Sequence, residues 1–141
     1  MTIEARRPTV IIADDHADIH PLLRRILEPE LNVVESVFDG QALLDATQRL
    51  LPDLVVVDVF MPVLDGIEAA KRLAQSTAVA IVFISTDAGE ENVERALRTG
   101  ALAFVRKASA AEDLLPAARA ALKGQRFVSA NPGFWSIGTA P

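Results

Sequence analysis

Residues 54–66, LVVVDVFMPVLDG, decide the fold of this chain. Four apolar and mostly β-branched residues stand in a row without alternation, which is typical of a strand buried on both faces of a parallel sheet. The run ends at Asp58, a carboxylate that is costly to bury unless a partner compensates it. Asp65 and Glu68 have the spacing of a capping box, which predicts that a helix begins directly after the loop. One strand, one loop and one helix are therefore expected in this order.

Apolar runs of the same kind recur on both sides of this stretch and alternate with segments of helical period. Further strands are expected at residues 10–13, 33–38, 79–84 and 103–107. Helices are expected at residues 19–27 and 42–50, and behind the capping boxes that begin at Asp65, Asp87 and Ser109. Five βα units with short connections predict an α/β doubly wound parallel sheet. The periodicity fits both a flavodoxin-like strand order 2-1-3-4-5 and a small nucleotide-binding order.

The helix ends and the chain termini carry signals of their own. Gly100 and Gly124 stand where a left-handed residue would end the fourth and fifth helices. Pro116 lies inside the last helix and is expected to kink or split it. Residues 1–8 are interpreted as an N-terminal tail, and residues 125–141 as a C-terminal tail or linker stub that packs on the domain or on a partner. Three of the chain's seven aromatic residues lie in that stub: Phe127, Phe134 and Trp135.

The composition of the 141 residues excludes several classes of protein. No cysteine is present, which removes cysteine-ligated metals and thiol catalysis and agrees with the reducing cytoplasm, where we expect the protein. The net charge of −5, from 14 basic and 19 acidic residues, argues against broad binding to nucleic acid. No apolar run is long enough to span a bilayer, so no membrane contact is expected.

Polar side chains that could carry chemistry follow four of the expected strands. They are Asp14, Asp15, Asp58, Ser85, Thr86 and Lys107. Ligands of open α/β sheets bind beyond the carboxyl ends of the strands, so these groups are expected to converge there. Carboxylates packed at about 4 Å repel by about 4 kcal/mol per pair at an effective dielectric of roughly 20, and a divalent cation such as Mg²⁺ offsets this repulsion. An aspartate held between a metal, an ammonium and a hydroxyl can act as a nucleophile toward phosphorus.

Four motifs, in order along the chain, then carry a resemblance to a known family. They are VIIADDH at residues 10–16, VDVFMPVLDG at 57–66, IST at 84–86 and FVRK at 104–107. Together they resemble the receiver domain of bacterial two-component response regulators over about residues 9–124, and this resemblance implies the flavodoxin-like strand order. The run ASAAEDLL that follows Lys107 is similar to the subgroup of receivers that precede LuxR-type helix-turn-helix domains.

The resemblance implies a phosphorylation site and a metal site. Asp58 would be the phosphoacceptor. Asp15 and Asp58 would bind Mg²⁺, or alternatively Mn²⁺, together with the backbone carbonyl of Phe60. Asp14 would hold a water bound to the metal.

Other residues would respond to the phosphoryl group by the same resemblance. Ser85 and Phe104 would form a switch pair, in place of the commoner threonine and tyrosine, and Lys107 would contact the phosphoryl group. Thr86 is bulkier than the usual residue and would narrow access to the phosphoacceptor. Lys107 is followed by Ala108 instead of proline, so we expect a trans peptide bond and a different loop before the last helix.

Three residues near these motifs have separate interpretations. Phe60 is expected to shield the acyl phosphate from hydrolysis, because an apolar side chain cannot orient an attacking water. His16 and His20 are interpreted as loop and helix-surface residues, since no partners stand at metal-ligand spacing in the sequence.

The expected function is a phosphorylation-controlled switch operated by a histidine kinase or a phosphorelay protein. Phosphorylation would change the surface of the fourth helix, fifth strand and fifth helix, and thereby control a partner, an output domain or a homodimer. No enzyme activity is expected beyond transfer to and hydrolysis from its own Asp58, and no direct binding to nucleic acid. Residues 125–141 are too few for a helix-turn-helix, which predicts a single-domain receiver or a fragment of a longer regulator.

Two other functions fit the same architecture. A phosphohydrolase or nucleotide-binding enzyme is one, although no phosphate-binding glycine loop is present and Phe60 stands where aspartate-nucleophile phosphatases have a second carboxylate. A receiver-like interaction module that has lost phosphorylation is the other, and Thr86 and Ala108 keep it open.

Overall fold

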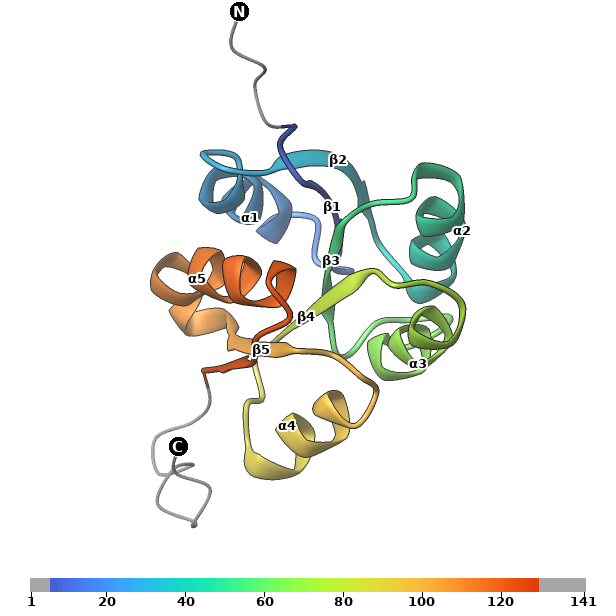
Figure 1. The fold of residues 1–141 in the computed structure, drawn as a ribbon. Helices are drawn as coiled ribbons and strands as arrows, with labels where there is room; N and C mark the ends of the chain where they lie inside the picture. The colour runs from blue at the N-terminus through green and yellow to red at the C-terminus, as the bar shows by residue number, and fades with distance from the viewer. Residues whose placement is uncertain (1–5, 130–141) are drawn as a thin grey trace, which may run out of the picture.

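The computed structural model describes residues 6–129, and its centre is a parallel sheet of six strands (Figure 1). The strands are β1 (Thr9–Ala13), β2 (Asn32–Val37), β3 (Leu54–Asp58), β4 (Ala80–Ser85), β5 (Ala103–Arg106) and β6 (Phe127–Val128). The helices are α1 (Ile19–Leu27), α2 (Gly40–Leu50), α3 (Gly66–Ser76), α4 (Glu90–Leu97) and α5 (Ala110–Leu122), with a short 3-10 helix, η1 (Lys107–Ser109). The strand order is β2-β1-β3-β4-β5-β6, which confirms the predicted doubly wound, flavodoxin-like fold and adds a sixth strand to it.

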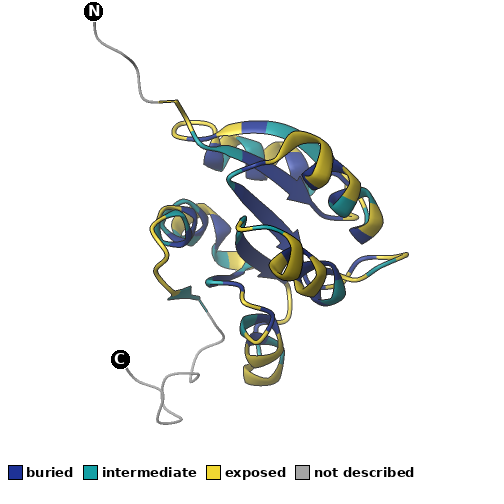
Figure 2. Ribbon diagram, turned by 45° about the vertical axis from the view of Figure 1, so that its right-hand side comes forward, coloured by how far each residue is buried: buried dark blue, intermediate teal, exposed yellow. Residues whose placement is uncertain are grey.

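The helices cover both faces of the sheet, because successive residues of each central strand point to opposite faces and are apolar. In β1, Val10 and Ile12 pack in a cluster with α1 and α5, while Ile11 and Ala13 pack in a second cluster with α2, α3 and α4. Figure 2 shows the strands as buried and the outer sides of the helices as exposed. This explains the unbroken apolar runs in the sequence, because both faces of each central strand are inside the protein.

The strand register brings the ends of β1, β3 and β4 to one edge of the sheet. Ala13 is paired with Val57, and Asp58 is paired with Ile84. Asp14 therefore follows β1 at the level where Asp58 ends β3, and Ser85 ends β4 beside them. Because these strands are parallel, the loops that follow them lie at the same edge, which is where the candidate site lies.

The helix starts agree only partly with the capping boxes. Asp65 Oδ1 accepts a hydrogen bond from Glu68 N at 2.8 Å, as predicted. Asp87 does not cap α4, because Gly89 occupies the cap position and donates its N–H to Asp87 Oδ1 instead. Ser109 makes no side-chain cap, since η1 takes up the residues before α5.

The proline inside α5 does not split the helix. α5 is continuous from Ala110 to Leu122, and Pro116 lies within it. Leu114 and Ala117, on either side of the proline, are fully buried against the sheet. Their packing holds the helix through the position where proline removes a backbone donor. Gly100 and Gly124 adopt positive φ angles of 103° and 74°, as predicted for the ends of α4 and α5.

The segment after α5 continues the sheet instead of leaving it. Phe127 and Val128 form β6, which pairs in parallel with β5. Phe127 N donates to Leu102 O at 3.1 Å, and Ser129 N donates to Phe104 O at 2.8 Å. This strand was not predicted. The predicted packing of the tail rested on Phe134, Trp135 and Ile137, which lie outside the described residues, so it stays a prediction. In the part of the chain that the structure describes, no helix is long and apolar enough to cross a membrane.

Candidate functional site

Three charged side chains meet at the carboxyl end of the sheet, at or directly after the ends of β1, β3 and β5. Lys107 Nζ lies 2.8 Å from Asp14 Oδ2 and 3.2 Å from Asp58 Oδ2. The side chains of Asp14, Asp58 and Lys107 are only 0%, 4% and 10% exposed. Two buried carboxylates therefore share one ammonium, as the sequence predicted for these three residues.

This group contains two carboxylates and one ammonium, and their interactions shift the pKa values of Asp58 and Lys107. Burial raises the pKa of Asp58, and the neighbouring charge of Asp14 raises it further, against the opposing effect of Lys107. Burial alone would lower the pKa of Lys107, but its hydrogen bonds and the charges of both carboxylates outweigh burial and raise that pKa. One ammonium is thus well compensated while the carboxylates keep an excess negative charge.

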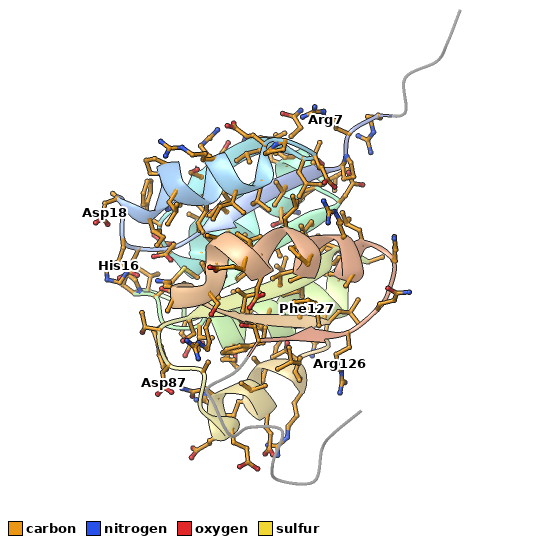
Figure 3. All side chains as sticks on the ribbon, turned by 90° about the vertical axis from the view of Figure 1, so that its left-hand side faces the viewer. Arg7, His16, Asp18, Asp87, Arg126 and Phe127 are labelled. Carbon is orange, nitrogen blue, oxygen red and sulfur yellow. The ribbon has the colours of Figure 1, made fainter. Side chains whose placement is uncertain are left out.

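The β1–α1 loop adds a third carboxylate and an imidazole. Asp15 is partly exposed, and His16 Nδ1 lies 3.2 Å from Asp14 Oδ1 and 3.3 Å from Asp15 Oδ1. One possible ligand atom from each of Asp14, Asp15, His16 and Asp58 lies within 4.8 Å of all the others. Figure 3 shows His16 and Asp87 at the same end of the molecule, away from Arg7 and Arg126. His16 is an exposed loop residue, as predicted, but its ring also lies beside Asp14 and Asp15, and β3 brings Asp58 into the same group.

His20 is buried and contacts the backbone of Asp14, so its interpretation as a helix-surface residue was wrong. Its side chain lies on the inner face of α1. His20 Nε2 is 2.8 Å from the carbonyl oxygen of Asp14, so this nitrogen carries the proton and donates. The ring of Phe38 packs against it with the ring centres 4.8 Å apart. The sequence gives little indication that His20 is buried, since Ile19 and Leu23 already account for the apolar face of the helix.

The β3–α3 loop encloses Asp58 on its other side. Phe60 N donates to Asp58 Oδ1 at 3.3 Å, and the Phe60 side chain is half exposed. Val63 has a φ of 68°, and Leu64 N donates to Pro62 O at 2.7 Å, which makes a strained γ-turn centred on a β-branched residue. No sequence pattern used above indicates this turn.

Gly66 allows α3 to begin directly against the site. A Cβ atom added at Gly66 would lie 2.0 Å from the carbonyl oxygen of Asp58. No side chain fits at that distance, so the close approach requires glycine. Asp65 thus caps the helix, while Gly66 keeps the first turn of α3 in contact with the end of β3.

The remaining predicted site residues lie on or beside β4 and β5. Ser85 is fully buried, and its Oγ accepts a hydrogen bond from Asp87 N at 3.1 Å. Phe104 is also fully buried, in the cluster with α2, α3 and α4, whereas Thr86 is exposed. Lys107 and Ala108 belong to η1, and no peptide bond among the described residues is cis, as expected for this loop.

Comparison with known proteins decides the family. Residues 10–119 match the family described as the response regulator receiver domain. The chain belongs to this family. A crystal structure of a LuxR-family two-component response regulator from Aurantimonas sp. SI85-9A1 has a TM-score of 0.84 and 28% identity, over 93% of this receiver domain chain and 94% of that one. The response regulator domain of Thermotoga maritima CheB has a TM-score of 0.78 and 30% identity, over 84% of this chain and 98% of that one.

The receiver domain also matches short parts of larger enzymes. The protein-glutamate methylesterase/protein-glutamine glutaminase of Azospirillum brasilense is 48% identical over 60 residues, which are 41% of this chain. That match covers 15% of the length of the Azospirillum protein. The corresponding protein of Methanosarcina barkeri is 41% identical over 69 residues, or 18% of its length. The likeness to these curated relatives is therefore a likeness of the receiver region alone.

The acidic cluster of this receiver domain fits a divalent cation. Receiver domains bind Mg²⁺ at an acidic pocket, and Asp14, Asp15 and Asp58 supply carboxylate oxygens, the donors that Mg²⁺ prefers. The excess negative charge left by the single ammonium of Lys107 is what a cation would neutralise. The donor chemistry and the charge of the site therefore agree with the family.

Proposed function

We propose that this receiver domain is a phosphorylation-controlled switch whose phosphoacceptor is Asp58. The observation that carries the proposal is the position of this carboxylate. It is almost completely buried, it lies 3.2 Å from the Lys107 ammonium, and it stands at the sheet edge where Asp14 and Asp15 converge. Burial and the charge of Asp14 raise the pKa of Asp58 against the opposing effect of Lys107, and carboxylates with shifted pKa values concentrate at functional sites.

The metal site would use the oxygen donors of the same edge. Asp15, Asp58 and the backbone carbonyl of Phe60 would hold Mg²⁺, and Asp14 would hold a water of that ion. When bound, the cation supplies positive charge that favours the ionised, nucleophilic form of Asp58 and neutralises phosphoryl oxygens.

The proposed chemistry is transfer of a phosphoryl group from a histidine kinase or a phosphorelay protein. A carboxylate oxygen of Asp58 forms a bond to phosphorus while the phosphorus–nitrogen bond of the donor's phosphohistidine breaks, and the imidazole leaves with the electron pair. Lys107, already within contact distance of Asp58, stabilises the charge on the transferring phosphoryl oxygens. The acyl phosphate ends when water attacks phosphorus, and the carboxylate of Asp58 is restored.

The proposed switch begins with Ser85 and is read through β5. The Ser85 hydroxyl would turn from Asp87 N to a phosphoryl oxygen. Phe104 is already fully buried, so its response would be a change of packing inside the core. That change would alter the face formed by α4, β5 and α5, where a partner, an output domain or a second copy would bind.

We also propose a division of the chain. Residues 9–124 would be the phosphorylated receiver, residues 1–8 would be a tail, and residues 125–141 would be a tail or linker whose first part adds β6 to the receiver sheet. The proposal is supported by the family match over residues 10–119. The similarity to LuxR-family and CheB receivers supports control of an output function, whether attached or separate.

The decisive test is phosphorylation by a small phosphodonor in the presence of Mg²⁺, read by intact mass. The wild-type chain is expected to gain the mass of one phosphoryl group, and Asp58→Asn is expected to gain none. Asp53→Asn is the matched control, because Asp53 precedes the same strand at its opposite end and should leave the gain unchanged. No gain in the wild type would favour an interaction module, and continuous turnover of the donor without a stable adduct would favour an enzyme.

A further inference from the structure

We propose that His16 is an additional ligand of the cation in this site, so that the receiver binds imidazole-preferring metals more tightly, relative to Mg²⁺, than an all-oxygen site would. The inference rests on the proposed function only in one respect: both require that the acidic cluster binds a divalent cation. It adds a nitrogen donor to the oxygen donors already assigned, and with it a selectivity among metals.

The distances around His16 are those of neighbouring ligands on one ion. Metal–oxygen and metal–nitrogen bonds are about 2.0–2.2 Å long for ions of this size. Two ligands at a right angle on such an ion are therefore about 3 Å apart. His16 Nδ1 lies 3.3 Å from Asp15 Oδ1, a proposed ligand, which is close to that separation, and it belongs to the group of possible ligand atoms that includes Asp58. It also lies 3.2 Å from Asp14 Oδ1, the carboxylate that would hold a water of the ion.

The loop presents the ring to the cluster and leaves it free to adjust. His16 N donates to Asp14 Oδ1 at 2.9 Å, which fixes the backbone of this residue against the site. Its side chain is 65% exposed, so the ring can follow an ion by small rotations without disturbing the core. An imidazole that donates to a carboxylate makes contacts of similar length, and the two roles are therefore distinguished by experiment.

No other imidazole can take this role. The chain contains two histidines and no cysteine. His20 is buried, and its Nε2 already donates to the carbonyl oxygen of Asp14 at 2.8 Å. Any imidazole nitrogen bound to the ion must therefore come from His16.

The chemistry of this donor predicts a change in selectivity more than in overall affinity. Mg²⁺ favours oxygen ligands and gains little from an imidazole. Nitrogen donors favour the later divalent ions, in the order Mn²⁺, Fe²⁺, Co²⁺, Ni²⁺ and Cu²⁺, with Zn²⁺ also well suited. The ratio of Ni²⁺ to Mg²⁺ affinity is thus the quantity that His16 should control.

The test uses the full chain without a histidine tag and compares the wild type with His16→Gln. Binding of Ni²⁺ and Mg²⁺ is measured by calorimetry above the usual imidazole pKa of about 6.5. We expect His16→Gln to lower the Ni²⁺ affinity by about tenfold or more, at least the loss that follows removal of an outer-shell partner, and to change the Mg²⁺ affinity less than about twofold. Pulsed electron paramagnetic resonance of bound Mn²⁺ should detect imidazole ¹⁴N in the wild type and not in His16→Gln.

Asp18→Asn is the matched control. It removes an exposed charge two residues after His16, at the start of α1, and leaves the cluster intact. Its metal affinities should keep the wild-type ratio. An equal loss of Ni²⁺ and Mg²⁺ affinity in His16→Gln, or a ¹⁴N signal that survives the substitution, would overturn the inference. Normal Mg²⁺ binding and phosphorylation without a nitrogen signal would refute His16 alone, whereas a wild type that binds none of these cations would refute the proposed metal site as well.

Discussion

The two ends of the sheet differ in what they bury. At the amino end, a cavity of about 430 Å³ lies between α2 and α3, and its lining includes Leu44, Leu51 and Leu73. At the carboxyl end, a cavity of about 370 Å³ is lined by Phe60, Asp87 and Gly89, and the buried charges of Asp14, Asp58 and Lys107 do not line it. The chemistry gathers where charge is buried and incompletely compensated, so cavity volume is a poor guide to the site in this molecule.

Two aspartates at opposite ends of β3 make the difference explicit. Asp53, just before the strand, accepts hydrogen bonds from Thr9 N at 2.8 Å and from Thr9 Oγ1 at 3.2 Å, and its side chain is 35% exposed. Asp58, at the end of the strand, is 4% exposed and shares its ammonium with Asp14. Both carboxylates have hydrogen-bond donors, but Asp58 is buried and shares its one cationic partner with a second carboxylate. Each of the following predictions compares a residue of the carboxyl end with a matched residue of the amino end.

The largest difference is expected between two glycines. Gly66→Ala should destabilise the fold by at least about 3 kcal/mol, since the new Cβ would meet the backbone oxygen of Asp58. Gly124→Ala should cost only about 1 kcal/mol, because nothing lies within 4 Å and only its positive φ opposes a side chain. Urea unfolding of both variants measures this. Similar losses in the two would mean that α3 can shift away from β3.

The two aspartates are expected to change stability in opposite directions. In a chelator at neutral pH, Asp58→Asn should raise the free energy of unfolding by about 1 kcal/mol, because it removes a poorly compensated buried charge. Asp53→Asn should lower it by about 1 kcal/mol, because charge-assisted hydrogen bonds to Thr9 weaken. Chemical unfolding of the three proteins measures both changes.

The pH dependence provides the control for this pair. The folded-state pKa of Asp58 is raised above its ordinary value of 3.8, so its carboxylate costs stability above the raised pKa. That cost disappears as the pH falls through the raised pKa toward the ordinary value. The advantage of Asp58→Asn over the wild type should therefore shrink on acidification. An advantage that grows instead would show that the carboxylate stabilises the fold.

The smallest effect is expected at two exposed apolar side chains. Phe60→Asn should shorten the lifetime of the acyl phosphate roughly threefold, about 0.7 kcal/mol of barrier, since an amide can orient the attacking water. Leu51→Asn, at the amino end and 75% exposed, should leave the lifetime unchanged. The decay of the phosphorylated mass in Mg²⁺ gives both rates. A lifetime in Phe60→Asn that equals or exceeds the wild-type value would contradict the shielding role.

Sequence patterns predicted most of the framework, because both the buried strands and the aspartate positions follow from local rules. The apolar run before Asp58 and the pair Asp14 and Asp15 were enough to bring the carboxylates together through the βα topology. His20 was misjudged because its position depends on the fold, which buries its ring and brings Nε2 to the carbonyl oxygen of Asp14. The nearness of His16 to Asp58 likewise depends on the fold, since β3 supplies Asp58. β6 has only two residues, and the turn at Val63 depends on its surroundings, so neither carries a periodic signal.

The short strand β6 also affects whether the edge of the sheet can pair with another chain. An open edge strand offers unpaired backbone groups that another chain can extend, which promotes aggregation. β6 occupies that edge of β5 and takes up the carbonyl oxygens of Leu102 and Phe104. At the opposite edge, β2 carries Glu35, whose charge is paired with Arg49. Among residues 6–129, the sheet therefore ends on one side in a strand too short to act as a template and on the other in a strand that carries a charge.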